Sequence, residues 1–207
     1  MLARKLINNI NNFFNIKDEY FDYKNLTLRK RIKFPCKKLP ECIINLLKDL
    51  KISSEQITTF KIEESSDKFT QSPHADTPEG QTTIIVPLKF TNNVFTITYK
   101  SFYYGKNKKG YKYRPNNKKY YKNEWLSKDH NKVKGLQKTN FPKKFFKTYL
   151  KNYDIENFKG LVVDNICKWK IGKPIEFLSN QLHSGSFYKN KKRWIVLHYK
   201  NLPINHH

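Results

Sequence analysis

Apolar and polar positions follow a helical period near the N-terminus and a strand period through most of the remaining chain. In KKLPECIINLLKDLKIS the apolar residues recur at helical spacing, which predicts an amphipathic helix. From Thr58 onward, β-branched and aromatic runs between polar turns predict strands: TTFKIEESS, TTIIVPLKF and NVFTITYKSFYY. After a short helix in FPKKFFKTYLKNY, strand composition returns in LVVDNICKWKIGKPIEFLSNQLHSGSF and RWIVLHYKN, with a turn at Gly172.

Helices followed by about seven short strands predict a mainly β domain, a sandwich or barrel with a helical cover. The 207 residues are enough for a single domain with a buried core. We expect residues 1–57 to form a helical or mixed N-terminal cap, residues 58–104 and 159–201 to form the β core, and residues 105–158 to form a basic insertion or lid with a short helix.

The composition is strongly basic, with a formal net charge of +24. Of the 41 basic residues 36 are Lys, and Asn, Ile, Tyr and Phe are abundant too, which is typical of drift in an AT-rich genome. Eight cations lie among tyrosines between Lys106 and Lys122. This segment is interpreted either as a mobile lid that recruits an anionic or acidic substrate, or as a solvated loop. A further alternative is a nucleic-acid-binding protein whose Lys/Tyr segment grips phosphates and stacks bases.

The cysteine spacing and the hydropathy pattern bear on the cellular compartment of the protein. Cys36, Cys42 and Cys167 fit neither a CxxC motif nor a paired disulfide framework, which favours a reducing environment. We recognise no signal peptide, and no apolar stretch approaches the ~18 residues that a membrane-spanning helix requires. The sequence therefore predicts a cytoplasmic protein without a membrane span.

Two histidines and an aspartate are the candidate metal ligands. His74 and Asp76 stand one residue apart just before a predicted strand, and His183 lies at the end of another. Two imidazoles and one carboxylate can occupy one face of a metal and leave the opposite positions open, as in the facial triad of non-haem Fe(II) oxygenases. A closed structural zinc site would use cysteines, which are not suitably spaced here. The alternative for the His74-x-Asp76 pair is a surface turn.

Arg193 stands ten residues after His183, in a chain where Lys greatly outnumbers Arg. The planar guanidinium binds a carboxylate through two parallel hydrogen bonds, which is a reason to keep Arg where drift favours Lys. A hairpin of this length would carry the chain from the metal into the neighbouring strand and bring Arg193 inside the barrel. The alternative is a stray cation in KNKKRW.

His74-x-Asp76, His183 and Arg193 together resemble the iron- and 2-oxoglutarate-dependent dioxygenases, in particular a small prolyl-hydroxylase-like or phytanoyl-hydroxylase-like member. The resemblance extends to HADTPEGQTTIIVPL and WKIGKPIEFLSNQLHSGSF, and covers roughly Thr58 to Tyr199 without the basic insertion. It implies a double-stranded β-helix (jelly roll, cupin-like) for the β core.

The resemblance also implies a chemistry. His74, Asp76 and His183 would hold Fe(II), and Arg193 would pair with the distal carboxylate of the co-substrate 2-oxoglutarate. The enzyme would use O2 to hydroxylate an unidentified substrate, with release of succinate and CO2. A jelly-roll protein that binds a metal without turnover is the alternative.

The chain departs from the family pattern after the arginine. Many relatives continue with x-Ser, whereas here the sequence is Arg193-Trp194-Ile195, so a helper hydroxyl is missing. Three residues are candidates to replace it at the co-substrate: Ser184, Thr83 and Tyr99. By contrast, His198, Trp169 and Phe177 are interpreted as core residues of their strands.

Overall fold

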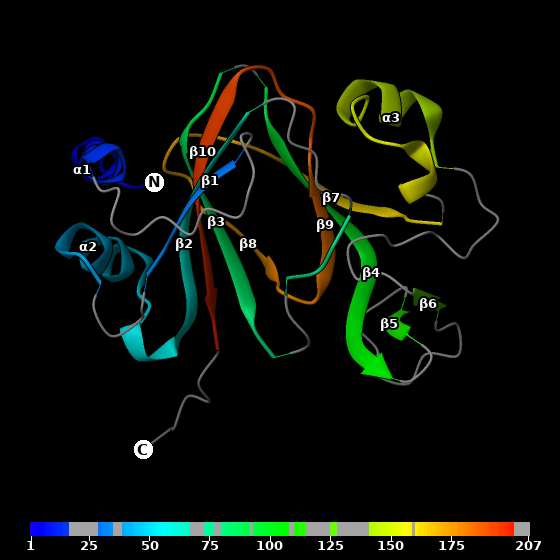
Figure 1. Ribbon diagram of the computed structural model, residues 1–207, viewed down its shortest axis with the longest axis horizontal. Helices are drawn as coiled ribbons and strands as arrows, with labels where there is room; N and C mark the ends of the chain where they lie inside the picture. Colours follow the sequence, from blue (N-terminus) through cyan, green and yellow to red (C-terminus); the bar gives the residue numbers. More distant parts are fainter. Residues whose placement is uncertain are drawn as a thin grey trace.

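Two antiparallel β-sheets form the framework of the described residues, with three α-helices at their outer sides (Figure 1). The computed structural model describes residues 1–16, 29–34, 39–66, 73–76, 80–91, 93–107, 110–114, 125–127, 141–158 and 160–200. The prediction of a mainly β protein is confirmed. Within the described residues, no helix is both long enough and apolar enough to cross a membrane.

The first sheet has five strands in the order β1-β2-β10-β3-β8. Every pairing in it is antiparallel. Its members come from both ends of the chain: β1 (Arg29–Lys33), β2 (Ile57–Ser66), β10 (Lys191–Tyr199), β3 (Thr82–Lys89) and β8 (Ile175–Leu178).

The second sheet has the order β6-β5-β4-β7, and β9 also pairs with β4. Its strands are β6 (Trp125–Ser127), β5 (Gly110–Arg114), β4 (Phe95–Asn107), β7 (Val163–Lys168) and β9 (Gln181–Gly185). The strands β5 and β6 fall in the stretch expected to be an insertion, and they extend this sheet, because β5 pairs with the C-terminal half of β4 and β6 pairs with β5. The lid predicted for Lys106–Lys122 falls largely outside the described residues, and the proposed division of the domain stays a prediction.

The helices α1 (Arg4–Ile16) and α2 (Glu41–Leu50) lie beside the first sheet, and α3 (Lys143–Tyr149) lies beside the second (Figure 1). Both α2 and α3 match the helices predicted from the sequence, whereas α1 was included only as part of a mixed cap. Apolar side chains of α1 and α2 pack on the outer face of the first sheet and bury one core cluster, which includes Ile10, Phe14, Ile43, Leu46, Phe60, Ile62, Ile195 and Leu197.

The inner face of the first sheet contributes to a different cluster together with residues that lead into or out of the second sheet. Trp169, Phe177, Trp194 and Val196 belong to it, so the prediction that Trp169 and Phe177 are core residues is confirmed. Because successive side chains of a strand point to opposite faces, β10 divides its residues between the two clusters. Ile195 and Leu197 pack toward the helices, and Trp194 and Val196 pack toward the interior.

Candidate metal centre

The three candidate metal ligands are brought together where the His74-x-Asp76 segment pairs with β9. His74 and His183 exchange both backbone hydrogen bonds, with N···O distances of 3.0 and 2.9 Å, and so form an isolated antiparallel pair. The backbone N–H of Asp76 donates to the carbonyl of Ser179 at 2.9 Å. These bonds fix the His74-x-Asp76 segment against β9, and strand alternation then puts His74 and Asp76 on the same side.

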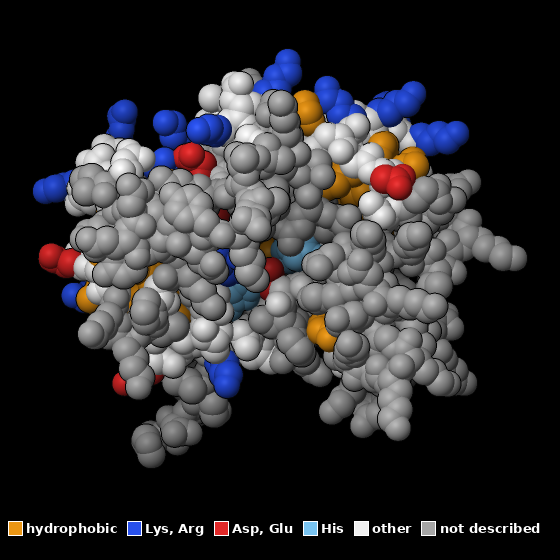
Figure 2. Space-filling view, viewed as in Figure 1, with side chains coloured by type: hydrophobic (Ala, Val, Ile, Leu, Met, Phe, Trp, Pro, Cys, Tyr) orange, Lys and Arg blue, Asp and Glu red, His pale blue; other side chains and the backbone are white. Residues whose placement is uncertain are grey.

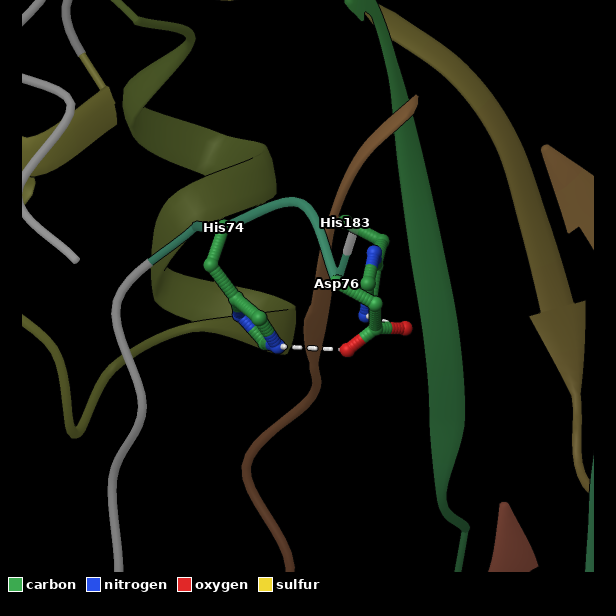
Figure 3. A group of neighbouring side chains, drawn as sticks. All are labelled: His74, Asp76 and His183. Carbon is green, nitrogen blue, oxygen red and sulfur yellow. Dashed lines mark ion pairs between the residues drawn. The ribbon is translucent and has the colours of Figure 1, made fainter. Parts of the chain in front are cut away.

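The three side chains point toward one another (Figure 3). The Nε2 atom of His74 lies 3.7 Å from Oδ1 of Asp76, and Nε2 of His183 lies 3.6 Å from Oδ2 of Asp76. One ligand atom from each residue falls within 4.8 Å of the others. Ligand atoms bound to a single ion at about 2.0–2.2 Å lie about 3–4 Å apart, so the donor set fits a metal without large movement. The sequence prediction that these residues come together agrees with this geometry.

Hydrogen bonding to the backbone orients the His183 ring. Its Nδ1 donates a hydrogen bond to the carbonyl oxygen of Gln181 at 3.1 Å, which leaves Nε2 facing Asp76. The ring also packs against Phe177, with centroids 4.6 Å apart. The orientation of a ligand nitrogen is therefore built into the fold before any metal binds.

The environment of Asp76 favours its ionised form. Burial opposes ionisation, but the neighbouring imidazoles of His183, His74 and His198 and the ammonium of Lys61 outweigh it and hold the pKa of Asp76 well below its ordinary value. The hydroxyl of Thr83 donates to Oδ2 of Asp76 at 3.2 Å and lies 2.8 Å from Oγ of Ser179. Thr83, expected at the co-substrate, is thus placed to orient a candidate metal ligand.

His198 belongs to this neighbourhood although the sequence indicated a core histidine. It is buried, as expected, but its Nε2 lies 4.0 Å from Oδ2 of Asp76 and its Nδ1 lies 3.4 Å from the hydroxyl of Thr83. Burial, together with the charges of Lys61 and His183, lowers the pKa of His198 to about 4 against the opposing effect of Asp76 and Glu63. At neutral pH the ring is therefore uncharged.

A pocket of about 120 Å³ opens beside the three candidate ligands. Figure 2 shows histidine and acidic side chains at the bottom of a recess near the centre of this face. Water needs about 10–15 Å³ of such volume, so the pocket has room for a small molecule. The lining combines the candidate ligands with cations and aromatic rings, namely Arg31, Lys61, Glu63, Tyr153, Trp169, Ser184, Lys192 and Trp194.

The expectation that Arg193 points inside the barrel is wrong. Its guanidinium donates to Glu64 Oε2 from Nε at 3.1 Å and from Nη2 at 2.7 Å, and it donates to side-chain oxygens of Asn11 and Asn15 at 2.9 Å. These partners belong to α1 and to the outer side of β2, so Arg193 lies on the face opposite the pocket. The physical reason is strand alternation, because residue 193 shares a face with Ile195 and Leu197.

Lys192, the neighbour of Arg193, lines the pocket instead. It is 7% exposed, and its Nζ lies 4.1 Å from the ring centroid of Tyr188 and 5.1 Å from those of Trp169 and Trp194. A Cβ atom added to Gly185 would lie 3.0 Å from the same nitrogen. Lys192 therefore crosses from the first sheet to β9, two residues beyond His183. The sequence pattern indicates Arg193, and not Lys192, as the residue facing inward, so Lys192 was not predicted.

The remaining predicted residues differ in their places. Ser184 lines the pocket, and the hydroxyl of Tyr99 lies 2.8 Å from its Oγ. Tyr99 is fully buried, and burial raises the pKa of its phenol well above the ordinary value. Tyr99 therefore supports Ser184 from below the pocket surface.

No family model and no curated protein matches the chain. Solved structures similar to it include a helix-turn-helix (HTH_3) family transcriptional regulator from Vibrio cholerae, at 10% identity and a TM-score of 0.39, with 93% of this chain and 62% of that chain covered. A prolyl-4-hydroxylase from Pseudomonas putida aligns at 8% identity and a TM-score of 0.44, over 97% of this chain and 89% of that chain. EvdMO1 aligns at 13% identity and a TM-score of 0.46, over 97% of this chain and 45% of that chain. At such TM-scores these similarities carry no argument about function.

Proposed function

We propose that the protein is an Fe(II)- and 2-oxoglutarate-dependent oxygenase that hydroxylates a substrate still to be identified. The observation that carries this proposal is the convergence of His74, Asp76 and His183 beside a pocket. Two imidazoles and a carboxylate on one side of an ion, with space on the other side, are the donor set of non-haem Fe(II) oxygenases. When bound, Fe(II) with 2-oxoglutarate supplies the activation of O2, which yields succinate, CO2 and the oxidised substrate.

The strand order supports the finer fold proposal, a jelly roll. In the first sheet β2, β10, β3 and β8 are neighbours, and in the second the bridge at His74, then β9, β4 and β7 follow one another. Two facing four-stranded antiparallel layers connected in this way are typical of double-sheet jelly rolls.

Lys192 takes the role first assigned to Arg193 in this proposal. Its ammonium brings positive charge into the same pocket as the three candidate ligands, near Gly185 on the ligand-bearing strand. We assign to it the distal carboxylate of 2-oxoglutarate, with Ser184 as the neighbouring hydroxyl. The aromatic rings around Nζ hold the ammonium in place and exclude water from it.

The proposal is tested in two measurements on the purified protein. Mn(II) binding under nitrogen, followed by calorimetry, should weaken at least about a hundredfold in His74→Ala, Asp76→Asn and His183→Ala, more than the loss of a group that only supports a ligand. Asp49→Asn, which removes an exposed carboxylate of α2, is the matched control and should bind like the wild type.

Succinate release from 2-oxoglutarate, with Fe(II) and O2 present, is the second measurement. It should depend on all three ligands, and Lys192→Met should raise the apparent KM for 2-oxoglutarate by at least about tenfold. Metal binding without any succinate release would instead leave the protein as a metal-binding jelly roll without turnover. The nucleic-acid alternative depended on the Lys/Tyr segment, most of which lies outside the described residues.

A further inference from the structure

The carboxylate of Asp76 is contacted by a threonine that is itself held from two other sides. Oγ1 of Thr83 lies 3.2 Å from Oδ2 of Asp76 and 2.8 Å from Oγ of Ser179. Nδ1 of His198 lies 3.4 Å from the same Thr83 oxygen. Thr83, Ser179 and His198 are all buried, so these contacts lie in the interior, where a hydrogen bond is stronger than in water.

The backbone fixes these residues relative to one another. Thr83 of β3 and His198 of β10 are direct cross-strand neighbours, so their side chains lie on the same face of the sheet. Ser179 comes directly after β8. Its N–H donates to the carbonyl of Gln81, and its carbonyl accepts from the N–H of Asp76, both at 2.9 Å. Ser179 therefore holds Asp76 through its main chain and Thr83 through its side chain.

The number of available protons sets the direction of each hydrogen bond. An ionised carboxylate only accepts, so the bond between Thr83 and Asp76 requires that Thr83 donate its single hydroxyl proton. A charged acceptor also makes the stronger hydrogen bond, which favours this direction over donation to Ser179 or His198. The two lone pairs of the Thr83 oxygen are then left to accept from Oγ of Ser179 and from Nδ1 of His198.

This direction selects one tautomer of the His198 ring. A neutral imidazole carries one proton, and a proton on Nδ1 leaves Nε2 as an acceptor. Nε2 of His198 lies 4.0 Å from Oδ2 of Asp76, which is too far for a hydrogen bond. His198 therefore supports the carboxylate through Thr83 and not by direct donation.

We propose that Thr83 is a positioning residue for the candidate metal ligand Asp76, and that Ser179 and His198 act on the carboxylate through it. The last torsion of an Asp side chain has broad preferences, so the side chain itself does not fix the plane of its carboxylate. The bond from Thr83 to Oδ2 fixes that plane, with Oδ1 toward His74 at 3.7 Å. The inference rests on the proposed function in taking the three candidate ligands as a metal site.

Metal affinity in hydroxyl variants tests the positioning role. Mn(II) binding is measured by calorimetry under nitrogen, and urea unfolding checks that each variant is folded. Thr83→Val keeps a similar shape and removes the hydroxyl, and it should weaken Mn(II) binding at least about tenfold. Thr83→Ser restores a hydroxyl and should bind within about threefold of the wild type. Thr82→Val removes a buried hydroxyl from the opposite face of β3, and as the matched control it should bind like the wild type.

A double-variant cycle shows whether Ser179 acts through Thr83. Ser179→Ala removes the donor to the Thr83 oxygen and should weaken Mn(II) binding about threefold or more. Added to Thr83→Val it should have no further effect, because the oxygen to which Ser179 donates is already gone. Equal losses in both backgrounds would overturn the route through Thr83. Wild-type affinity in Thr83→Val, or a loss in Thr83→Ser as large as in Thr83→Val, would overturn the positioning role itself.

The tautomer of His198 gives a readout that needs no metal. A proton–nitrogen correlation spectrum of the metal-free protein with isotope-labelled histidine, at neutral pH, distinguishes a protonated ring nitrogen from a bare one. The signals that disappear in His198→Asn assign the ring. We expect the proton on Nδ1, and a proton on Nε2 would overturn the proposed direction of the bonds.

Succinate release by the same proteins separates this inference from the proposed function. Mn(II) binding that depends on the Thr83 hydroxyl, in a protein that releases no succinate, would keep the positioning role and refute the oxygenase. Succinate release that depends on the three ligands, together with wild-type Mn(II) affinity in Thr83→Val, would keep the oxygenase and refute the positioning role.

Discussion

Replacement of Arg193 by Met should destabilise the protein and leave co-substrate binding intact. The side chain is 7% exposed and connects three elements, since it donates to Glu64 of β2 and to Asn11 and Asn15 of α1 while its own residue belongs to β10. Its guanidinium carbon also lies 4.1 Å from the ring centroid of Phe14. The substitution would remove the cation and leave the Glu64 carboxylate without this partner.

The size of the effect follows from these contacts. Breaking one partner of a buried ion pair costs about 3–5 kcal/mol, and the lower end applies here because the Glu64 side chain is 16% exposed. The individual hydrogen bonds share one guanidinium and are not additive, so we expect about 3 kcal/mol for Arg193→Met. At about 2–4 °C per kcal/mol for a chain of this size, the midpoint of thermal unfolding should fall by roughly 6–12 °C.

Urea unfolding of the purified variants measures this free energy. The matched control is Lys191→Met, whose ammonium lies 3.9 Å from Glu64 and is 74% exposed, and it should cost less than about 0.5 kcal/mol. A loss below about 1 kcal/mol in Arg193→Met would contradict the reasoning. So would a larger loss of 2-oxoglutarate affinity in folded Arg193→Met than in Lys192→Met.

Two further predictions concern pH and backbone geometry. The pKa of His198 is about 4 in the folded protein against 6.5 ordinarily, so between these values only the unfolded chain takes up this proton and stability falls with falling pH. The free energy of unfolding of the metal-free protein, measured with urea, should therefore fall by about 2 kcal/mol from pH 7 to pH 5. In His198→Gln it should fall by less over the same range. Gly172→Ala should cost at least about 1–2 kcal/mol in the same assay, because φ is +69° and the added Cβ would lie 2.4 Å from Ile7 Cδ1. Gly80→Ala should lose less unfolding free energy. Its φ is +100°, which strains an Ala backbone, but an added Cβ would meet no neighbouring atom.

The candidate metal ligands could be predicted because their chemistry is local in the sequence. His74 and Asp76 are two residues apart, so an extended backbone puts both on one side, and His183 was recognised by its strand context. What the sequence could not provide is the direct pairing of His74 with His183, which depends on a bridge between segments more than a hundred residues apart.

The orientation of Arg193 could not be predicted, since β10 is buried on both faces. Trp194, Ile195, Val196 and Leu197 are all apolar, so the strand lacks the apolar-polar alternation that reveals which face points inward. The spacing from His183 was then the basis of the prediction. It indicated Arg193, whereas the residue that faces the pocket is its neighbour Lys192. A one-residue difference in register exchanges the two faces of a strand.

The register of β10 therefore determines both the stability of the helical cover and the chemistry of the pocket. In the observed register Lys192 and His198 reach the interior, while Arg193 binds α1 from the outer face. A shift by one residue would bury the guanidinium in the pocket and leave α1 without its buried partner. The Arg193–Glu64 pair opposes that shift, because Glu64 is the direct cross-strand neighbour of Arg193 and is itself partly buried. Arg193, the residue that resembled a co-substrate ligand, thus favours the register in which Lys192 is the cation that faces the pocket.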